Sequence, residues 1–356
     1  MTPKQTLWPL EPHTRGKHEV LRHYLAAWFP ILGSFSGRVA FIDGFAGPGE
    51  YQGGEKGSPL IALDAFRQHA PKLKSEVVFL FIDKDPDRAE HLRKLVESSQ
   101  RPANCQVEVA TSEFEKKMTA VLDSMPSGSR LAPAFVMLDP FGISGAPMTL
   151  IGRLLKSSKA EIYISFMYEF IDRFKATPEF ETPMTELYGT DEWRQGLALE
   201  GEAKKRFFFD LYDRQLRKAG TKHVVRFDLY EKRRLVYAIF FATKHWKGAD
   251  VMKKAIWKVA PFGDFAFRGA HYGQLTFDTV DYGFLRKALQ ERFKSKGWVS
   301  FEIVEEFAGS DQTDFHSGHL KAHALAPMEK EGLIEVDAKS RKKRFRFPPG
   351  TRLRFL

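Results

Sequence analysis

Short, uninterrupted apolar runs alternate with amphipathic stretches along the first two thirds of the chain. Each run stops at polar or turn residues, which is typical of parallel strands buried on both faces. We expect strands at residues 39–42, 77–82, 105–110, 135–138 and 161–165. Helical spacing of apolar residues fills the intervals, at residues 14–29, 60–69, 87–97 and 147–155. This alternation predicts a doubly wound α/β sheet.

The sheet is expected to finish in an antiparallel hairpin. A polar insertion near 171–205 and a helix at 207–219 come first, and two apolar runs, at 224–229 and 235–242, then flank the charged turn 231–234. The insertion is rich in acids and aromatics, which suits a lid or a target-recognition segment. A plain surface excursion is the simpler expectation.

The last 75 residues predict a separate module. Residues 263–281, rich in glycine and aromatics, suit a linker that follows an α/β domain at 1–262. Helices are expected at residues 284–296, 301–307 and 316–331, and a small hairpin at 333–336 and 344–347, with 339–343 at its tip. Three helices and a basic two-stranded wing predict a C-terminal winged-helix domain at 282–356.

The first predicted strand runs into Asp43-Gly44-Phe45-Ala46-Gly47-Pro48-Gly49. An acid at a strand end, followed by glycines that let a ligand approach the backbone, indicates a nucleotide-type pocket. The dinucleotide fingerprint fails because its third glycine position holds Gln52, and a P-loop fails because Lys56 follows Glu55. What remains resembles motif I of the S-adenosylmethionine-dependent methyltransferases. A tight structural turn is the alternative.

Polar residues also follow the other strands, and the sheet should gather them along one rim. Asp83 is placed to accept both ribose hydroxyls, Asp43 to attract the amino group of the cofactor, and Ser112 or Glu113 to meet the adenine amine. Each acid taken alone also suits a helix cap. The candidate S-adenosylmethionine-binding residues are Lys17, Asp43, Phe45, Ala46, Gly47, Gly49, Ser58, Asp83, Ser112 and Glu113.

Asp139-Pro140-Phe141-Gly142 closes the fourth strand. It resembles motif IV of methyltransferases that act on exocyclic amines of nucleobases, and the same spelling occurs in enzymes that methylate the guanine amine of transfer RNA. The Asp139 carboxylate and the Pro140 carbonyl would accept hydrogen bonds from the target amine, and Phe141 would offer a ring face to an extruded base. A turn that ends a strand is the alternative.

The formal net charge is +10, and eight basic residues with no acid lie between Lys339 and Arg354. A solvated tail and a nucleic-acid patch both fit such a run. Its place at the predicted wing favours DNA or RNA, with the third helix as the recognition element, although a winged helix can also dock a protein. The candidate nucleic-acid-binding residues are His319, Lys321, His323, Lys339, Arg341, Lys342, Lys343 and Arg344.

Other classes of site and location are disfavoured. No apolar run approaches the ~18 residues of a membrane helix, and the single Cys105 excludes internal disulfides. We therefore expect a cytoplasmic protein without a membrane partner. His319 and His323 lie four apart but lack the intervening glutamate of a zincin, so no metal is expected.

The whole chain resembles the three-Cys-motif partner proteins of bacteria and phages. The residues that carry the resemblance are Pro12-His13-Thr14, Lys17-His18, Asp43 to Gly49, Gly57-Ser58-Pro59-Leu60, Asp139 to Gly142, and the stretch Ala242 to Val259. The resemblance implies a Rossmann-like methyltransferase fold and a three-Cys partner protein, itself like radical S-adenosylmethionine enzymes. Lys17, ahead of motif I, resembles a residue of the cofactor-contacting helix that precedes this motif in adenine-amine methyltransferases, with a helix-surface lysine as the alternative.

Together these features favour a methyltransferase that uses S-adenosylmethionine to modify an exocyclic nucleobase amine in DNA or RNA. Two other hypotheses stay open. One is a non-catalytic nucleic-acid-binding or sensor protein with a retained cofactor pocket. The other is a subunit that is active only with a three-Cys-motif partner.

Overall fold

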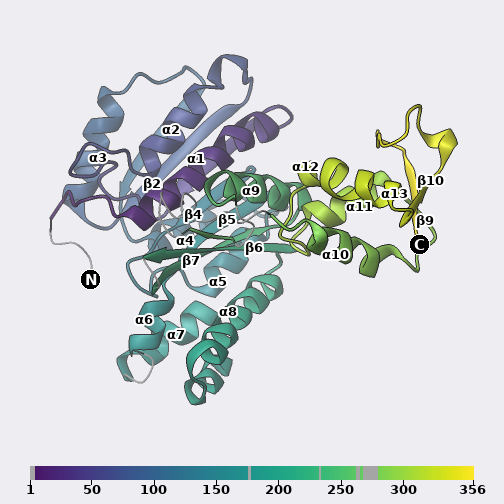
Figure 1. The fold of residues 1–356 in the computed structure, drawn as a ribbon. Helices are drawn as coiled ribbons and strands as arrows, with labels where there is room; N and C mark the ends of the chain where they lie inside the picture. The colour runs from purple at the N-terminus through teal and green to yellow at the C-terminus, as the bar shows by residue number, and fades with distance from the viewer. Residues whose placement is uncertain (1–4, 175–177, 232–233, 262–264, 268–279) are drawn as a thin grey trace. The chain divides into compact units, whose positions relative to one another are not determined.

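The computed structural model describes residues 5–174, 178–231, 234–261, 265–267 and 280–356. The chain divides into two compact units. The first comprises Met1–Lys244 and Ala266–Ala270, and the second His245–Phe265 and His271–Leu356. Figure 1 shows the elements of both units. In the described parts, no helix is both long and apolar enough to span a membrane.

The first unit is built on one eight-stranded sheet with the order β3-β2-β1-β4-β5-β7-β6-β8. The first five strands run parallel, β7 lies antiparallel between β5 and β6, and β8 pairs in parallel with β6. The strands are β1 (Arg38–Asp43), β2 (Glu76–Asp83), β3 (Cys105–Thr111), β4 (Ala134–Leu138), β5 (Ala160–Phe166), β6 (His223–Glu231), β7 (Arg234–Thr243) and β8 (Ala266–Phe267). This is a mixed α/β architecture with a sheet dominated by parallel strands, and the predicted α/β class is confirmed.

Helices cover both faces of the sheet. Figure 1 shows α1 and α2 on one side, and α5 and α8 on the other. The first-unit helices are α1 (Pro12–Gly33), α2 (Ser58–Arg67), α3 (Pro86–Ser98), α4 (Phe114–Ser124), α5 (Met148–Leu155), α6 (Tyr168–Phe174), α7 (Glu181–Tyr188) and α8 (Gly201–Lys218). The chain leaves β1 outward through β2 and β3, then returns to β4 on the other side. The crevice at this reversal lies at the carboxyl ends of β1 and β4.

The insertion near 171–205 is not the surface excursion that its polarity suggested. It forms α7 and a 3-10 helix, Asp191–Ala198. Met184, Tyr188 and Trp193 are buried in the core beside β4 and β5. The polar residues that dominate its composition lie on the outer faces, so composition alone hid a short amphipathic pattern.

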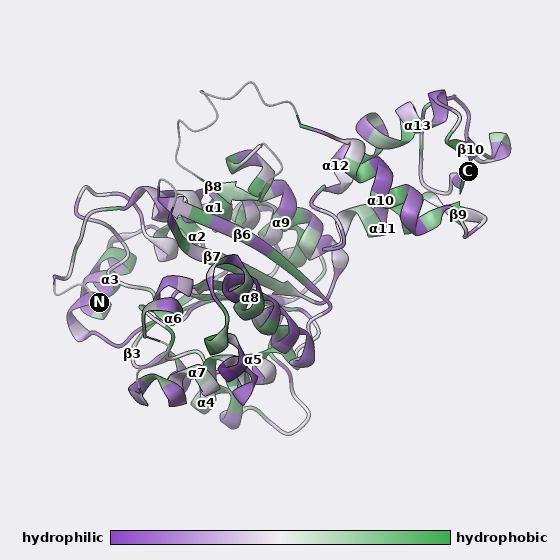
Figure 2. Cartoon of the chain, turned by 60° about the horizontal axis from the view of Figure 1, so that its bottom comes forward, coloured by the Kyte–Doolittle hydropathy of each residue, from purple (hydrophilic) through white to green (hydrophobic). Residues whose placement is uncertain are grey.

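The second unit has its own core. Its helices are α9 (Trp246–Val259), α10 (Gly283–Phe293), α11 (Phe301–Gly309), α12 (Ser317–His319) and α13 (Ala326–Lys330), with a π-helical turn at Leu320–Leu325. Its strands β9 (Trp298–Ser300), β10 (Ile334–Val336) and β11 (Arg352–Phe355) form an antiparallel sheet with β11 in the middle. In Figure 2, α10 and α11 show purple and green stretches in turn, as amphipathic helices do. The winged-helix assignment stays a prediction.

Two expectations for this region need correction. The strand expected at 344–347 does not form, and the partner of β10 is β11 instead. The boundary between the units lies at His245 rather than at 262, because α9 belongs to the second unit, where Trp257 joins the core. The expected linker at 263–281 falls mostly outside the described residues.

Candidate functional site

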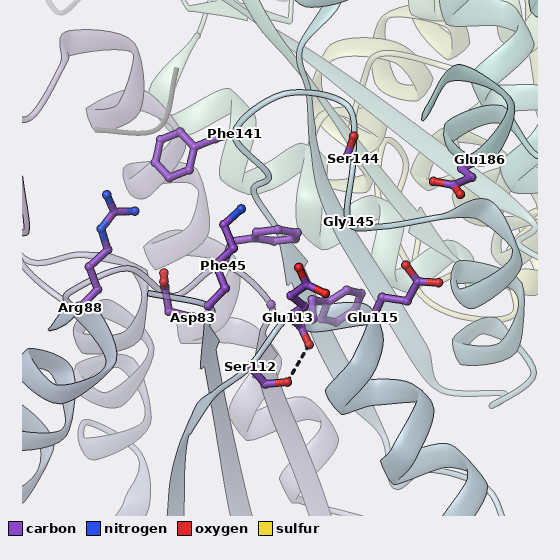
Figure 3. Close-up of a pocket in the computed structure, with 13 residues that line it drawn as sticks. Phe45, Asp83, Arg88, Ser112, Glu113, Glu115, Phe141, Ser144, Gly145 and Glu186 are labelled. Carbon is purple, nitrogen blue, oxygen red and sulfur yellow. Dashed lines mark hydrogen bonds between the residues drawn. The ribbon is translucent and has the colours of Figure 1, made fainter. Parts of the chain in front are cut away.

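The rim expected from the strand ends is present. Gly44, Asp83, Ser112, Glu113 and Phe141 line one cavity of about 310 Å³, together with Phe45, Lys84, Arg88, Phe114, Glu115, Ser144, Gly145 and Glu186. Figure 3 shows these side chains facing a common space. A second cavity, of about 180 Å³, shares Phe45 and Phe141 with the first. The structure therefore brings together residues from four strand ends that are far apart in sequence.

The acid at the end of β2 is fixed by backbone amides. Gly47 N and Asp85 N each donate a hydrogen bond of 2.8 Å to the Asp83 carboxylate. Burial raises the pKa of Asp83 above its ordinary value. Each carboxylate oxygen has a second lone pair. Asp83 can therefore hold the glycine loop in place and still accept a hydrogen bond from a ligand.

The loop after β1 needs glycine at two positions for different reasons. Gly47 has a φ of +61°, a backbone conformation that side chains rarely adopt. At Gly44 a Cβ atom would lie only 2.5 Å from the Phe114 ring. Gly47 lets the loop turn over the strand end, and Gly44 lets Phe114 pack beneath the loop.

Asp43, at the end of β1, carries an unsatisfied buried oxygen. Its Oδ1 accepts a hydrogen bond of 3.2 Å from Phe45 N, while its Oδ2 accepts none from any described residue. Burial raises the pKa of Asp43 to about 7. The nearby Ser58 hydroxyl and the Phe45 amide lower this pKa, but by less than burial raises it. An orphaned carboxylate oxygen of this kind suits a cationic ligand group.

Lys17 and Asp139 form an ion pair in the second cavity. Lys17 is only 2% exposed, so the alternative of a helix-surface lysine is wrong. Burial by itself would raise the pKa of Asp139, but the Lys17 ammonium outweighs it and holds that pKa below its ordinary value. Asp139 is therefore an ionised hydrogen-bond acceptor. The Lys17 ammonium also lies 5.4 Å from the centre of the Tyr237 ring.

The two residues after Asp139 form a tight turn. Gly142 N donates a hydrogen bond of 3.0 Å to the Pro140 carbonyl, which leaves that oxygen one lone pair for a ligand. Phe141 is 46% exposed, although it is a large apolar side chain. The Arg88 guanidinium lies 5.9 Å from the centre of the Phe141 ring. The role of Phe141 as a ring face for a base stays a prediction.

Several side chains of the second cavity escaped the sequence reasoning. The Trp8 ring lies edge-on to Tyr51 and to Phe141, with centroids 5.9 and 6.0 Å apart. The Arg88 guanidinium lies 5.0 Å from the Trp8 ring, and Tyr237 enters from β7. No pattern distinguishes these residues, because Tyr237 looks like core in an alternating strand and Trp8 lies before the first helix.

The candidate nucleic-acid residues of the second unit fall into two groups. On the third helix, Lys321 and His323 are exposed, whereas His319 packs against Trp257 with ring centroids 4.4 Å apart. In the loop between β10 and β11, Arg341 pairs with Glu329, and both side chains are 7% exposed. The other four candidates of this loop, Lys339, Lys342, Lys343 and Arg344, are exposed, as is Arg346. Arg341 therefore anchors the loop rather than facing solvent.

No family model and no curated protein matches the sequence. Solved structures do align with it at low similarity. The DszA carbon methyltransferase is 14% identical, over 65% of this chain and 54% of its own, with a TM-score of 0.38. Human methyltransferase-like protein 13 in complex with SAH is 12% identical, over 68% of this chain and 91% of its own, with a TM-score of 0.36. Cofactor-bound Rv0187 from MTB is 12% identical, over 63% of this chain and 79% of its own, with a TM-score of 0.31. The fold assignment rests on the strand order.

Proposed function

We propose that this protein is an S-adenosylmethionine-dependent methyltransferase that acts on an exocyclic amine of a nucleobase in DNA or RNA. One observation carries the proposal. Asp139 is ionised and lines the second cavity, and the exposed ring of Phe141, two residues later, lines both cavities. An acceptor beside a stacking surface is what an amine on a flat base requires.

The residues present fit the cofactor. Asp83 has lone pairs for ribose hydroxyls, and Ser112 and Glu113 line the same cavity, as adenine recognition would need. The orphaned Oδ2 of Asp43 suits an ammonium group. We therefore assign S-adenosylmethionine as the cofactor within the proposal.

The chain's own residues would act by alignment. When bound, the cofactor supplies an electrophilic methyl group. Asp139 and the Pro140 carbonyl would accept hydrogen bonds from the amine and point its lone pair toward that methyl. Phe141 would hold the base plane, and positioning of this kind accounts for large rate factors without a covalent intermediate on the protein. Because Asp139 is ionised, it accepts hydrogen bonds without first losing a proton.

The second unit would bind the sugar-phosphate backbone of the nucleic acid. The exposed Lys339, Lys342, Lys343 and Arg344 suit phosphate contacts. On the sheet, Trp298 is 41% exposed, and the Arg354 guanidinium lies 5.5 Å from its ring. A ring beside guanidinium groups binds bases and phosphates together. A three-Cys-motif partner stays a separate prediction, which co-purification would test.

The test uses purified protein, methyl-labelled S-adenosylmethionine and separate pools of DNA, transfer RNA and ribosomal RNA. Digestion to nucleosides then identifies the labelled base. We expect label on an adenine, guanine or cytosine amine in one pool. Confirmed cofactor binding with no label in any pool would contradict the proposal and favour a sensor or a subunit that needs its partner.

A further inference from the structure

Lys17 occupies the acceptor that the proposed substrate needs. It donates to Asp139 Oδ2, and it lines the second cavity together with Gly47, Gly49 and Ser58. A buried ammonium that contacts the substrate acceptor and lines the same cavity as the glycine loop can exchange partners. We propose that Lys17 leaves Asp139 for the α-carboxylate of the bound cofactor, and thereby frees Asp139 for the target amine. This inference rests on the proposed function.

The charges around Lys17 support the exchange. Of its neighbours, His18 is fully buried, and desolvation lowers the pKa of His18 to about 3, so the ring is neutral. The positive charge in this cavity is then the Lys17 ammonium. It has one described carboxylate partner, Asp139, and the Tyr237 ring as a weak second contact. A carboxylate that enters this cavity meets Lys17 as its natural counter-ion.

Asp43 is fully buried and lines neither cavity, but it lies at the end of β1, two residues before Phe45 of the second cavity. Its buried Oδ2 lacks a partner in the described structure, at the end of the strand that leads into the glycine loop. A ligand with an ammonium and a carboxylate on one carbon would satisfy Asp43 with the first group and Lys17 with the second. The amino-acid end of S-adenosylmethionine and of S-adenosylhomocysteine has this chemistry, whereas 5′-methylthioadenosine lacks it.

The exchange couples the two binding steps. In the free protein, Asp139 competes with the cofactor carboxylate for Lys17, and Lys17 competes with the amine for Asp139. Binding of the cofactor should therefore strengthen binding of the base, and the reverse must hold to the same extent. Lys17 is thus a positioning residue, because it acts on the substrate through Asp139.

Calorimetry with two ligands tests this coupling without any turnover. Asp139→Asn removes the competing charge, so S-adenosylhomocysteine should bind this variant at least about five-fold more tightly than it binds the wild type. Methylthioadenosine should bind the variant and the wild type with equal affinity. Lys17→Met should weaken S-adenosylhomocysteine about ten-fold or more and leave methylthioadenosine unchanged. Lys17→Arg keeps the charge and should restore most of the lost affinity. Lys56→Met, at an exposed lysine that lines neither cavity, is the matched control and should change nothing.

The outcomes separate this inference from the proposed function. Unchanged S-adenosylhomocysteine affinity in Asp139→Asn would overturn the exchange. The exchange would also be overturned if Lys17→Met weakened the binding of both ligands equally and Lys17→Arg restored neither affinity. Because methylthioadenosine reports a folded pocket, it also identifies a variant that has simply unfolded. A wild-type protein that binds neither ligand would overturn the proposed function, and the exchange with it.

Discussion

At the scale of single residues, Asp83 links the glycine loop to the cofactor cavity. Asp83→Ala removes a carboxylate that would accept ribose hydroxyls and that already binds Gly47 N. The loss of charged hydrogen bonds should weaken S-adenosylhomocysteine binding by about ten-fold or more. Calorimetry measures this directly.

The matched control for Asp83 is Asp87→Ala. Asp87 is an exposed acid in the first turn of α3 and lines neither cavity. Its substitution should leave the affinity within two-fold of wild type, as expected of a surface change. Equal effects of the two substitutions would remove Asp83 from the pocket.

From the raised pKa of Asp43 we predict that the stability of the cofactor-free protein depends on pH. Burial raises this pKa to about 7, so the folded state holds a proton that the unfolded chain releases near pH 4. This contribution to stability is complete below about pH 4 and is lost as the pH rises to about 7. Asp43→Asn should therefore stabilise the free protein at pH 8 by on the order of 1 to 3 kcal/mol, and much less at pH 5.

Denaturant unfolding of wild type and Asp43→Asn at the two pH values measures the difference. Ser75→Ala is the control, because Ser75 is buried before β2, at the opposite end of the strands from Asp43, and its loss removes no charge. Its effect should be similar at both pH values. A stabilisation by Asp43→Asn that does not depend on pH would contradict the assignment of a raised pKa.

The residues that the sequence could identify are those fixed by a strand end. Asp43, Asp83 and Asp139 follow continuous apolar runs, and parallel strands bring such positions to one rim. Trp8, Tyr51 and Tyr237 could not be found this way, because each reaches the second cavity through tertiary packing. The Lys17–Asp139 pair likewise depends on how α1 crosses the sheet, which no local pattern records.

At the scale of elements, periodicity identified seven of the eight strands of the large sheet and missed the two-residue β8. It misplaced the last strand of the second unit. Arg344-Phe345-Arg346-Phe347 alternates as a strand would. In the structure, Phe345 has a φ of +59°, and Phe347 is the buried member. The true strand, Arg352–Phe355, pairs on both sides, with β9 and β10, and this long-range pairing outweighs the local pattern.

The third helix of the second unit also departs from a regular pattern. Pro327 lacks an N–H, so it cannot bond the carbonyl of His323 four residues earlier. That carbonyl accepts a hydrogen bond of 3.1 Å from Arg286 Nε instead. The preceding π-helical turn, Leu320–Leu325, widens the helix at this place. Sequence spacing treats the helix as uniform and misses this irregularity.

The contacts of Lys253 lead to a prediction about the stability of the second unit. The Lys253 ammonium is buried and donates to the carbonyls of Ala308, Ser310, Thr313 and Phe315. These bonds join α9 to the end of α11 and to the segment that follows it. Lys253→Met leaves those buried carbonyls unpaired and should cost about 3 kcal/mol or more. Thermal unfolding should show a lowered transition for the second unit.

Lys258→Met is the control for Lys253, because Lys258 lies exposed on the same helix. It should shift the same transition by less than about 0.5 kcal/mol. Equal stability of the Lys253→Met and wild-type proteins would show that the carbonyls find other partners.

At the scale of the whole molecule, the positive charge of +10 is concentrated partly in the basic loop of the second unit. Lys342→Glu with Lys343→Glu should weaken nucleic-acid binding, and the dependence of log K on log salt should fall by about one for each lysine that contacts a phosphate. Fluorescence anisotropy at several salt concentrations gives both values. Arg341 is excluded from this test because it pairs with Glu329.

Lys72→Glu with Lys74→Glu makes the same charge change at exposed positions of the first unit. This pair should weaken binding much less than the pair in the loop. If both pairs weaken binding alike, the effect comes from net charge, and the basic loop is not the contact surface.

The division into two units was predictable in kind but not in place. The charge run and the glycine-rich stretch marked a separate C-terminal module. They could not show that α9 belongs to it, because the contacts of Lys253 and Trp257 join residues more than fifty positions apart. Sequence patterns report such contacts poorly, since they depend on the finished fold.

The most direct test of the central claim compares methyl transfer by wild-type and Asp139→Asn proteins. Each is incubated with methyl-labelled S-adenosylmethionine and the nucleic-acid pool that the wild type modifies best. We predict label on one exocyclic amine with the wild type, and a rate at least about a hundred-fold lower with Asp139→Asn, while cofactor affinity does not weaken. Transfer at the wild-type rate by Asp139→Asn, or no transfer by a wild-type protein that binds the cofactor, would contradict the account.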